Sequence, residues 1–147
     1  MKMKKLMPLL LLITILSPAF GQSGEVFTTE EGAIHGYDPV AYFNQGKAVK
    51  GKKEFSYLWN GAQWFFSSKQ NMETFKSKPE KYAPQYGGYC AYGTSEGHKA
   101  PTEADAFTVV GDKLYFNYNK EVRTDWAKNQ KDLIKKADKN WPSVKKQ

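Results

Sequence analysis

Aromatic and polar residues alternate through the middle of the chain in a pattern typical of β-hairpins. Large apolar side chains occupy every second position over 55–59, the dipeptide Asn60-Gly61 follows, and an extended pattern resumes over 64–66. Asn-Gly is the dipeptide favoured in a tight primed turn, so this stretch predicts a hairpin. A second hairpin, with a less regular turn, is predicted over 107–118.

Helical spacing of apolar residues predicts two helices. One is short, starting at Ser68 and ending near Pro79. The other is long, running from about 120 to 140 and stopped by Pro142. The segment around Cys90 is expected as loop and extended chain. Two hairpins and two helices, without alternating strand-helix-strand units, predict a single α+β domain.

The first 21 residues have the layout of a signal peptide. Three lysines precede an apolar run over 6–16, and small residues at Ala19 and Gly21 suit a signal peptidase. Because the run is too short for a stable anchor, we expect cleavage before Gln22 and export to the periplasm or the exterior.

The expected organisation is a signal peptide over 1–21, a flexible lead-in over 22–32, a domain over 33–142 and a basic tail over 143–147. The alternative, an uncleaved membrane anchor, is disfavoured by the short run and by the cleavage site. After cleavage, 126 residues would remain, enough for one core without disulfide bonds.

The charge distribution excludes few functions but argues against nucleic-acid binding. The chain has 22 basic and 15 acidic residues. Loss of the leader removes three lysines and leaves a net charge of +4. Much of that excess lies near the C-terminus, where lysines alternate with aspartates as on the solvated face of a helix. No concentrated basic patch is apparent, so no nucleic-acid partner is predicted.

Cys90 is the only cysteine, and an unpaired thiol is unusual in a chain expected to be exported. The two histidines, His35 and His98, are the other strong soft or borderline ligands in the expected mature chain. Thiolate and imidazole together favour copper or zinc over magnesium or calcium. A metal site is therefore one hypothesis, although no Cys-x-x-Cys or His-x-x-x-His spacing supports it.

Other interpretations of these residues stay open. Cys90 can be a small buried residue packed beside Gly88 and Tyr89. The histidines can be ordinary surface or structural residues. A cysteine hydrolase would need an activated thiol and an orienting partner, and no signature of one is present. Aromatic runs can line a ligand groove, but alternation within hairpins favours a core role.

Five segments of the chain resemble the YHS domain family, specifically its small secreted members. They are 33–43, 57–68, 75–82, 86–91 and 135–142, in the same order. Related YHS modules accompany heavy-metal transport ATPases and some multicomponent hydroxylases. The resemblance therefore implies a non-enzymatic module that binds or senses a metal.

The sequence departs from the metal-type YHS modules at their cysteine positions. Ala41 stands where those modules have a cysteine after Asp-Pro-Val, and Phe66 or Ser67 stands at a second such position. A structural zinc site is therefore not implied. A lone thiolate suits copper better than a closed four-ligand zinc site.

We accordingly predict a copper ion held by Cys90, with His35 and His98 as second-rank ligands. Tyr37, Asp38 and Tyr89 are expected to support those ligands. The predicted partners are a metal ion and, as an alternative function, another protein docked on the aromatic face with Cys90 buried and no metal. No catalytic residue and no membrane anchor in the mature chain are predicted.

Overall fold

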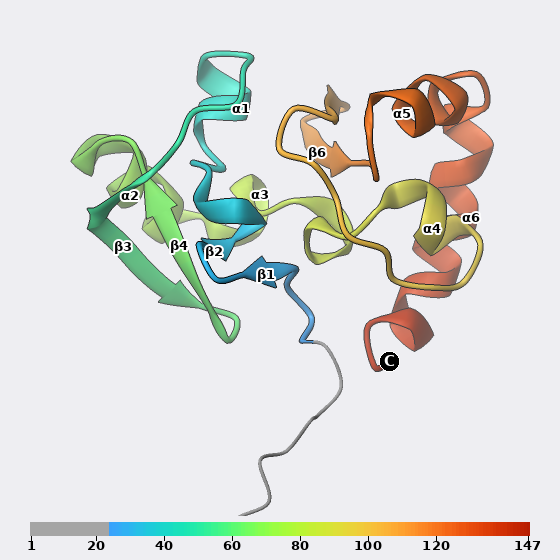
Figure 1. The fold of residues 1–147 in the computed structure, drawn as a ribbon, viewed down its shortest axis with the longest axis horizontal. Coiled ribbons are helices and arrows are strands. Elements are labelled where there is room, and N and C mark those ends of the chain that lie inside the picture. The colour runs from blue at the N-terminus through green and yellow to red at the C-terminus, as the bar shows by residue number, and fades with distance from the viewer. Residues whose placement is uncertain (1–23) are drawn as a thin grey trace, which may run out of the picture.

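The computed structural model describes residues 24–147, which form a mixed α+β fold, as predicted (Figure 1). The predicted signal peptide lies outside these residues. The strands are β1 (Thr28–Thr29), β2 (Gly32–Ala33), β3 (Lys52–Trp59), β4 (Ala62–Phe66), β5 (Phe107–Val110) and β6 (Lys113–Phe116). Within the described residues they pair as three two-stranded antiparallel sheets, β1-β2, β3-β4 and β5-β6.

Six α-helices and two 3₁₀ turns complete the described part of the chain. The helices are α1 (Ala41–Asn44), α2 (Lys69–Ser77), α3 (Pro79–Tyr82), α4 (Ala91–Ser95), α5 (Lys120–Ala127) and α6 (Gln130–Val144), and the turns are η1 (Ile34–Gly36) and η2 (Gln85–Gly88). In Figure 1 the β3-β4 hairpin and α2 lie at one end of the molecule, with α4, α5 and α6 at the other. No described helix has the length and apolar content needed to cross a bilayer.

Both predicted hairpins are present. Asn60 and Gly61 have φ angles of 49° and 73°, the left-handed pair that a tight primed turn requires. Gly111 and Asp112 each have φ of 58°. The second turn is therefore as regular as the first, because aspartate tolerates the left-handed region better than most residues.

The C-terminal helical prediction needs a correction. The single helix expected over 120–140 is two helices, since α5 ends at Ala127 and α6 begins at Gln130. Asn129, between them, has a non-helical φ of −137°. Pro142 does not stop α6 but lies in its last turn, and the helix continues to Val144, which is 1% exposed. Proline cannot donate a backbone hydrogen bond, but it is tolerated in this turn, in which Val144 is buried.

Two further segments are more structured than the sequence pattern indicates. The flexible lead-in predicted over 22–32 is ordered over its described part, which contains the buried Val26, strand β1 and the first residue of β2. The Phe27 amide donates to the Gly87 carbonyl, which joins this segment to η2. The segment after Cys90, expected as loop, forms the short helix α4.

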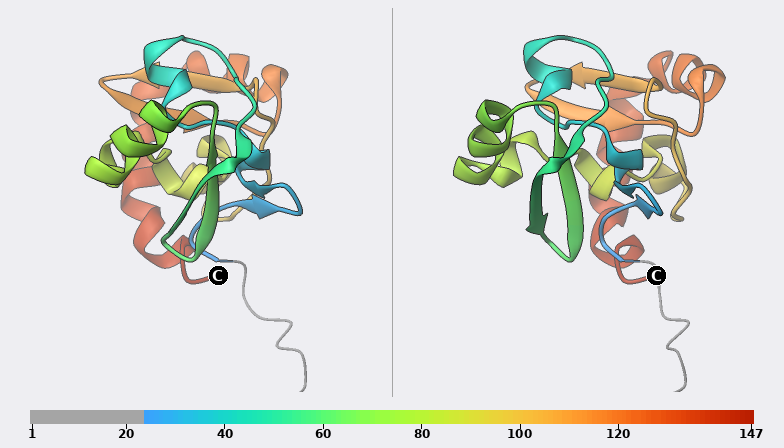
Figure 2. Two further views of the ribbon diagram at one scale, coloured as in Figure 1. Left: turned by 90° about the vertical axis from the view of Figure 1, so that its left-hand side faces the viewer. Right: turned by 60° about the vertical axis from the view of Figure 1, so that its left-hand side comes forward.

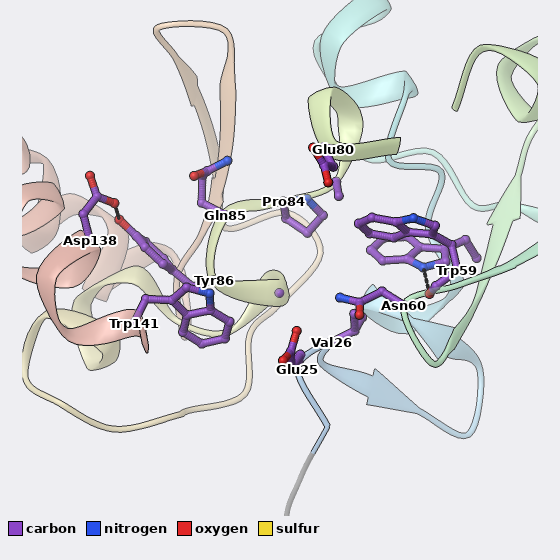
Figure 3. A pocket seen from close by; sticks show the side chains of 13 residues that line it. Glu25, Val26, Trp59, Asn60, Glu80, Pro84, Gln85, Tyr86, Asp138 and Trp141 are labelled. Atoms are coloured by element: carbon purple, nitrogen blue, oxygen red, sulfur yellow. Dashed lines mark hydrogen bonds between the residues drawn. The ribbon is translucent and has the colours of Figure 1, made fainter. Parts of the chain in front are cut away.

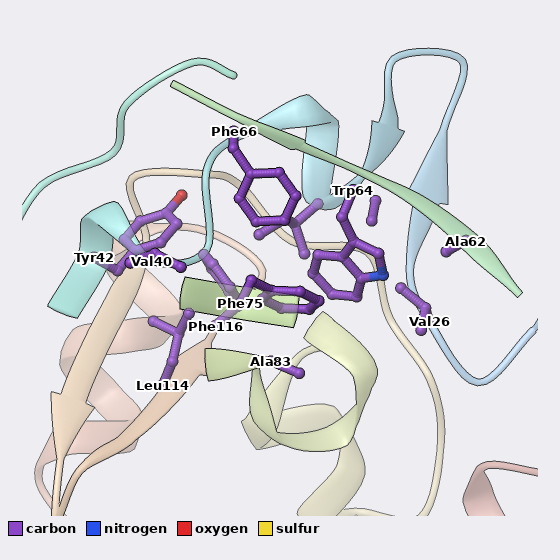
Figure 4. Packing of buried hydrophobic residues seen from close by; sticks show 12 residues of the cluster. Val26, Val40, Tyr42, Ala62, Trp64, Phe66, Phe75, Ala83, Leu114 and Phe116 are labelled. Atoms are coloured by element: carbon purple, nitrogen blue, oxygen red, sulfur yellow. The ribbon is translucent and has the colours of Figure 1, made fainter. Parts of the chain in front are cut away.

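The core consists of two hydrophobic clusters. The first surrounds Phe75, whose ring lies 5.2 Å from that of Phe66 and 5.3 Å from that of Trp64 (Figure 4). The second contains Trp126, Tyr115 and two buried side chains of α6, Leu133 and Ala137. Figure 2 shows α6 along the side of the molecule away from the β3-β4 hairpin. The two clusters therefore lie toward different ends of the molecule.

Candidate functional site

Cys90 is a core residue at the start of α4. Its side chain is 2% exposed, and its backbone N–H donates to the Ala100 carbonyl at 3.0 Å. The thiol donates to Asn117 Oδ1 at 3.5 Å and accepts from the Gly93 N–H at 3.5 Å. Burial raises the pKa of the Cys90 thiol, and hydrogen bonds from backbone N–H groups offset only part of that effect. A protonated, buried thiol is a weak metal ligand and a weak nucleophile.

The two histidines lie in different surroundings. His35 lines a cleft of about 360 Å³ with Glu31, Tyr37 and Lys50, and Cys90 is not part of that lining. The His35 Nε2 donates to the Thr102 carbonyl at 2.6 Å. His98 is exposed and follows α4. Its Nε2 would be 3.3 Å from a Cβ atom built on Gly93, so it lies near the turn that holds Cys90.

Asp38 is fully buried and accepts hydrogen bonds from several neighbours. Its Oδ1 accepts from the Val40 amide at 2.9 Å and the Ala41 amide at 3.3 Å. Its Oδ2 accepts from the Ser67 amide and hydroxyl at 2.8 and 2.7 Å, and from Asn71 Nδ2 at 2.8 Å. The carboxylate thus fastens the segment before α1 to the start of α2, a structural role.

Tyr37 and Tyr89 also contact other parts of the fold. The Tyr37 ring lies 5.0 Å from Lys50 Nζ, at the rim of the His35 cleft. Tyr89 is 6% exposed and its hydroxyl donates to the Gly24 carbonyl at 2.9 Å. Across residues 24–147, no three His, Cys, Asp or Glu side chains are grouped so that they could hold a metal ion. The described conformation therefore does not assemble Cys90, His35 and His98 into one site.

A groove of about 430 Å³ lies where the two hydrophobic clusters meet (Figure 3). Trp59, at the end of β3, forms one wall with the buried Trp64 beneath it. Trp141, on α6, forms the opposite wall and packs against Tyr86 with ring centroids 5.9 Å apart. Pro84 lies between the two walls. Trp59 and Trp141 are both partly exposed, so their rings are accessible to a ligand.

The charged side chains that line the groove are all acidic. They are Glu25, Glu80 and Asp138, and no lysine, arginine or histidine is among the lining residues. Asp138 accepts a hydrogen bond from the Tyr86 hydroxyl at 2.8 Å. Burial, followed by that hydrogen bond, raises the pKa of Tyr86, so the hydroxyl stays protonated. Lys145 Nζ approaches Glu25 at 4.0 Å.

Sequence reasoning did not find this groove. The alternating pattern places Trp59 in the hairpin predicted over 55–66, and Trp141 directly follows the helix predicted over 120–140. The groove depends on residues more than 80 positions apart. No local pattern signals that the carboxylates of Glu25, Glu80 and Asp138 line one surface.

Comparison with known proteins identifies part of the chain. Residues 40–86 match the family model of the YHS domain. The chain contains a YHS domain. The match covers α1, the β3-β4 hairpin, α2, α3 and the start of η2. No curated protein and no solved structure matches the chain.

The position of the YHS domain separates the two candidate sites. Residues 40–86 contain neither cysteine nor histidine, so Cys90, His35 and His98 all lie outside the matched segment. The same segment supplies Trp59, Trp64, Glu80 and Pro84 to the groove. The groove is therefore built partly from the YHS domain and partly from the segments that flank it.

Proposed function

We propose that this protein is a non-enzymatic binding module that holds a small-molecule ligand in the groove between Trp59 and Trp141. The observation that supports this most directly is the groove itself. Its volume of about 430 Å³ lies within the usual range for small-molecule sites, which is roughly 300 to 1,000 Å³. Two accessible tryptophan rings and a few polar groups are typical of such a site.

In this proposal Cys90 stabilises the fold and takes no part in chemistry. Its thiol is enclosed, donates to Asn117 and has a raised pKa. A thiol-dependent enzyme would need the opposite, an accessible thiol with a lowered pKa. Export of the protein remains a prediction from the sequence.

The groove can be tested with three probes that share one ring and differ in charge: benzylamine, benzyl alcohol and benzoate. Each is titrated into the ¹⁵N-labelled protein at neutral pH while the indole N–H signals are followed. Trp59→Phe and Trp141→Phe assign the indoles of the two groove walls, and the buried Trp64 is the third indole that lines the groove. Trp126, which is buried and does not line the groove, serves as an internal reference.

We expect at least one probe to shift the Trp59 and Trp141 signals and to leave Trp126 unchanged. If none of the three moves either groove indole, the groove is not a small-molecule site. Reaction of native Cys90 with a thiol reagent, at the rate seen in the unfolded protein, would contradict its role in the core.

Copper binding at Cys90 is a second candidate, favoured by the YHS domain at residues 40–86. Copper(I) would have to reach a thiol that is 2% exposed, so binding would require α4 or its neighbours to open. Anaerobic Cu(I) titration against a chromophoric chelator, with Cys90→Ser beside the native protein, tests this. One-to-one binding lost in the variant would establish metal handling, and variants of His35 and His98 would then identify further ligands.

A further inference from the structure

The charge of the groove indicates which ligands it accepts. Three carboxylates line it without a basic side chain, although the chain as a whole has a net charge of +7. The groove is therefore acidic although the whole chain is basic. An acidic groove attracts cationic ligands. Lys145 neutralises part of the Glu25 charge from outside the lining, and Glu80 has no ion pair with a described side chain.

The aromatic walls favour the same ligand charge. A cation within about 6 Å of a tryptophan face is attracted by the ring quadrupole, and tryptophan is the most favourable ring for this. Trp59 and Trp141 present such rings from opposite sides of the groove, and Figure 3 shows Glu80 at the upper side and Glu25 at the lower side of the space between them. The aromatic rings and the carboxylates therefore both favour a cationic ligand.

We propose that the ligand of the groove is a small organic cation, an amine with an apolar body. This rests on the proposed function, because it names the class of ligand for that groove. The apolar body lies against the indole rings of Trp59 and Trp141, and the ammonium group faces Glu80 or Glu25. Asp138 is less available because its carboxylate already accepts the Tyr86 hydroxyl.

The three ring probes distinguish the proposal of a cationic ligand from the broader proposal that the groove binds a small molecule. We expect benzylamine to bind at least about ten-fold more tightly than benzyl alcohol, and benzoate not to bind. Glu80→Gln should weaken benzylamine binding about three-fold, as should Glu25→Gln, and added salt should weaken it further. Glu54→Gln is the matched control, since Glu54 is exposed on β3 and does not line the groove.

Binding of benzyl alcohol or benzoate in place of benzylamine would overturn the cation proposal and leave the groove as a binding site. Failure of all three probes would reject both proposals. An unchanged benzylamine affinity in the Glu25→Gln, Glu80→Gln double variant would also overturn the cation proposal. A capped Ala-Ala-Lys-Ala-Ala peptide that binds more tightly than free butylamine would overturn the small-molecule assignment and place the ammonium group on a protein partner.

Discussion

The environment of Cys90 explains why an unpaired thiol can persist in this chain. The sulfur is shielded from solvent, and its thiol donates to the side chain of Asn117. Because burial disfavours the thiolate, the folded protein keeps the thiol in its least reactive form. Oxidation and mispairing both require the thiolate, so folding itself protects the residue.

The raised pKa of Cys90 gives stability a dependence on pH. The unfolded thiol ionises above its usual pKa of about 8.5, whereas the folded thiol stays protonated. The folded state therefore loses relative stability as pH rises through the unfolded value. We expect Cys90→Ala to cost about 1 kcal/mol near neutral pH and less at about pH 9.5.

Denaturant unfolding of native protein and Cys90→Ala at the two pH values measures this difference. Tyr42, Tyr86 and Tyr115 also have raised pKa values through burial, but they are present in both proteins and cancel in the comparison. A cost that grows with pH would show that the thiolate is stabilised in the folded protein.

At the level of elements, local sequence signals predicted turns and helix starts better than helix lengths. Asn60-Gly61 specifies its turn through backbone preference alone, and Ser68 caps α2 by accepting the Asn71 amide at 3.1 Å. The break between α5 and α6 and the continuation past Pro142 depend instead on which side chains the tertiary fold buries. Those effects have no local signature, and the same is true of the groove.

Contact between η2 and the N-terminal segment forms one side of the groove. Alanine substitutions at two glycines, Gly87 and Gly61, can test this contact. Gly87 and Gly61 have similar positive φ angles of 62° and 73°. A Cβ on Gly87 would lie 1.7 Å from the Glu25 carbonyl oxygen, whereas a Cβ on Gly61 would meet nothing within 4 Å. Backbone strain is therefore nearly the same at the two positions, and steric contact differs.

We expect Gly61→Ala to lower the free energy of unfolding by about 1 kcal/mol, through backbone strain. Gly87→Ala should lower it by several kcal/mol and should also weaken benzylamine binding, because Glu25 has to move. Denaturant titration and the probe titration measure the two effects. Equal stability losses in the two variants would show that the N-terminal segment does not pack against η2 as described.

At the scale of the molecule, β6 joins the two hydrophobic clusters. Leu114 and Phe116 belong to the first cluster, and Tyr115, on the opposite face of the strand, belongs to the second. A strand that serves both clusters couples their unfolding. The groove at their junction is therefore intact only when both clusters are folded.

This coupling predicts a single unfolding transition. Far-UV circular dichroism and tryptophan fluorescence should give the same denaturant midpoint, for native protein and for Phe116→Ala. The variant should be less stable by about 3 to 5 kcal/mol, because Phe116 is 1% exposed. Val110→Ala, at an exposed position on β5, should change stability by about 0.5 kcal/mol or less. Separate transitions for the two probes would mean that the clusters fold independently.

The central claim is that binding takes place in the groove and does not require the thiol. The most direct test is the benzylamine titration of Cys90→Ala, followed by the indole signals of Trp59 and Trp141. We predict the same dissociation constant and the same shifts as in the native protein. Loss of benzylamine binding in a variant that remains folded would contradict the account and place the function at Cys90.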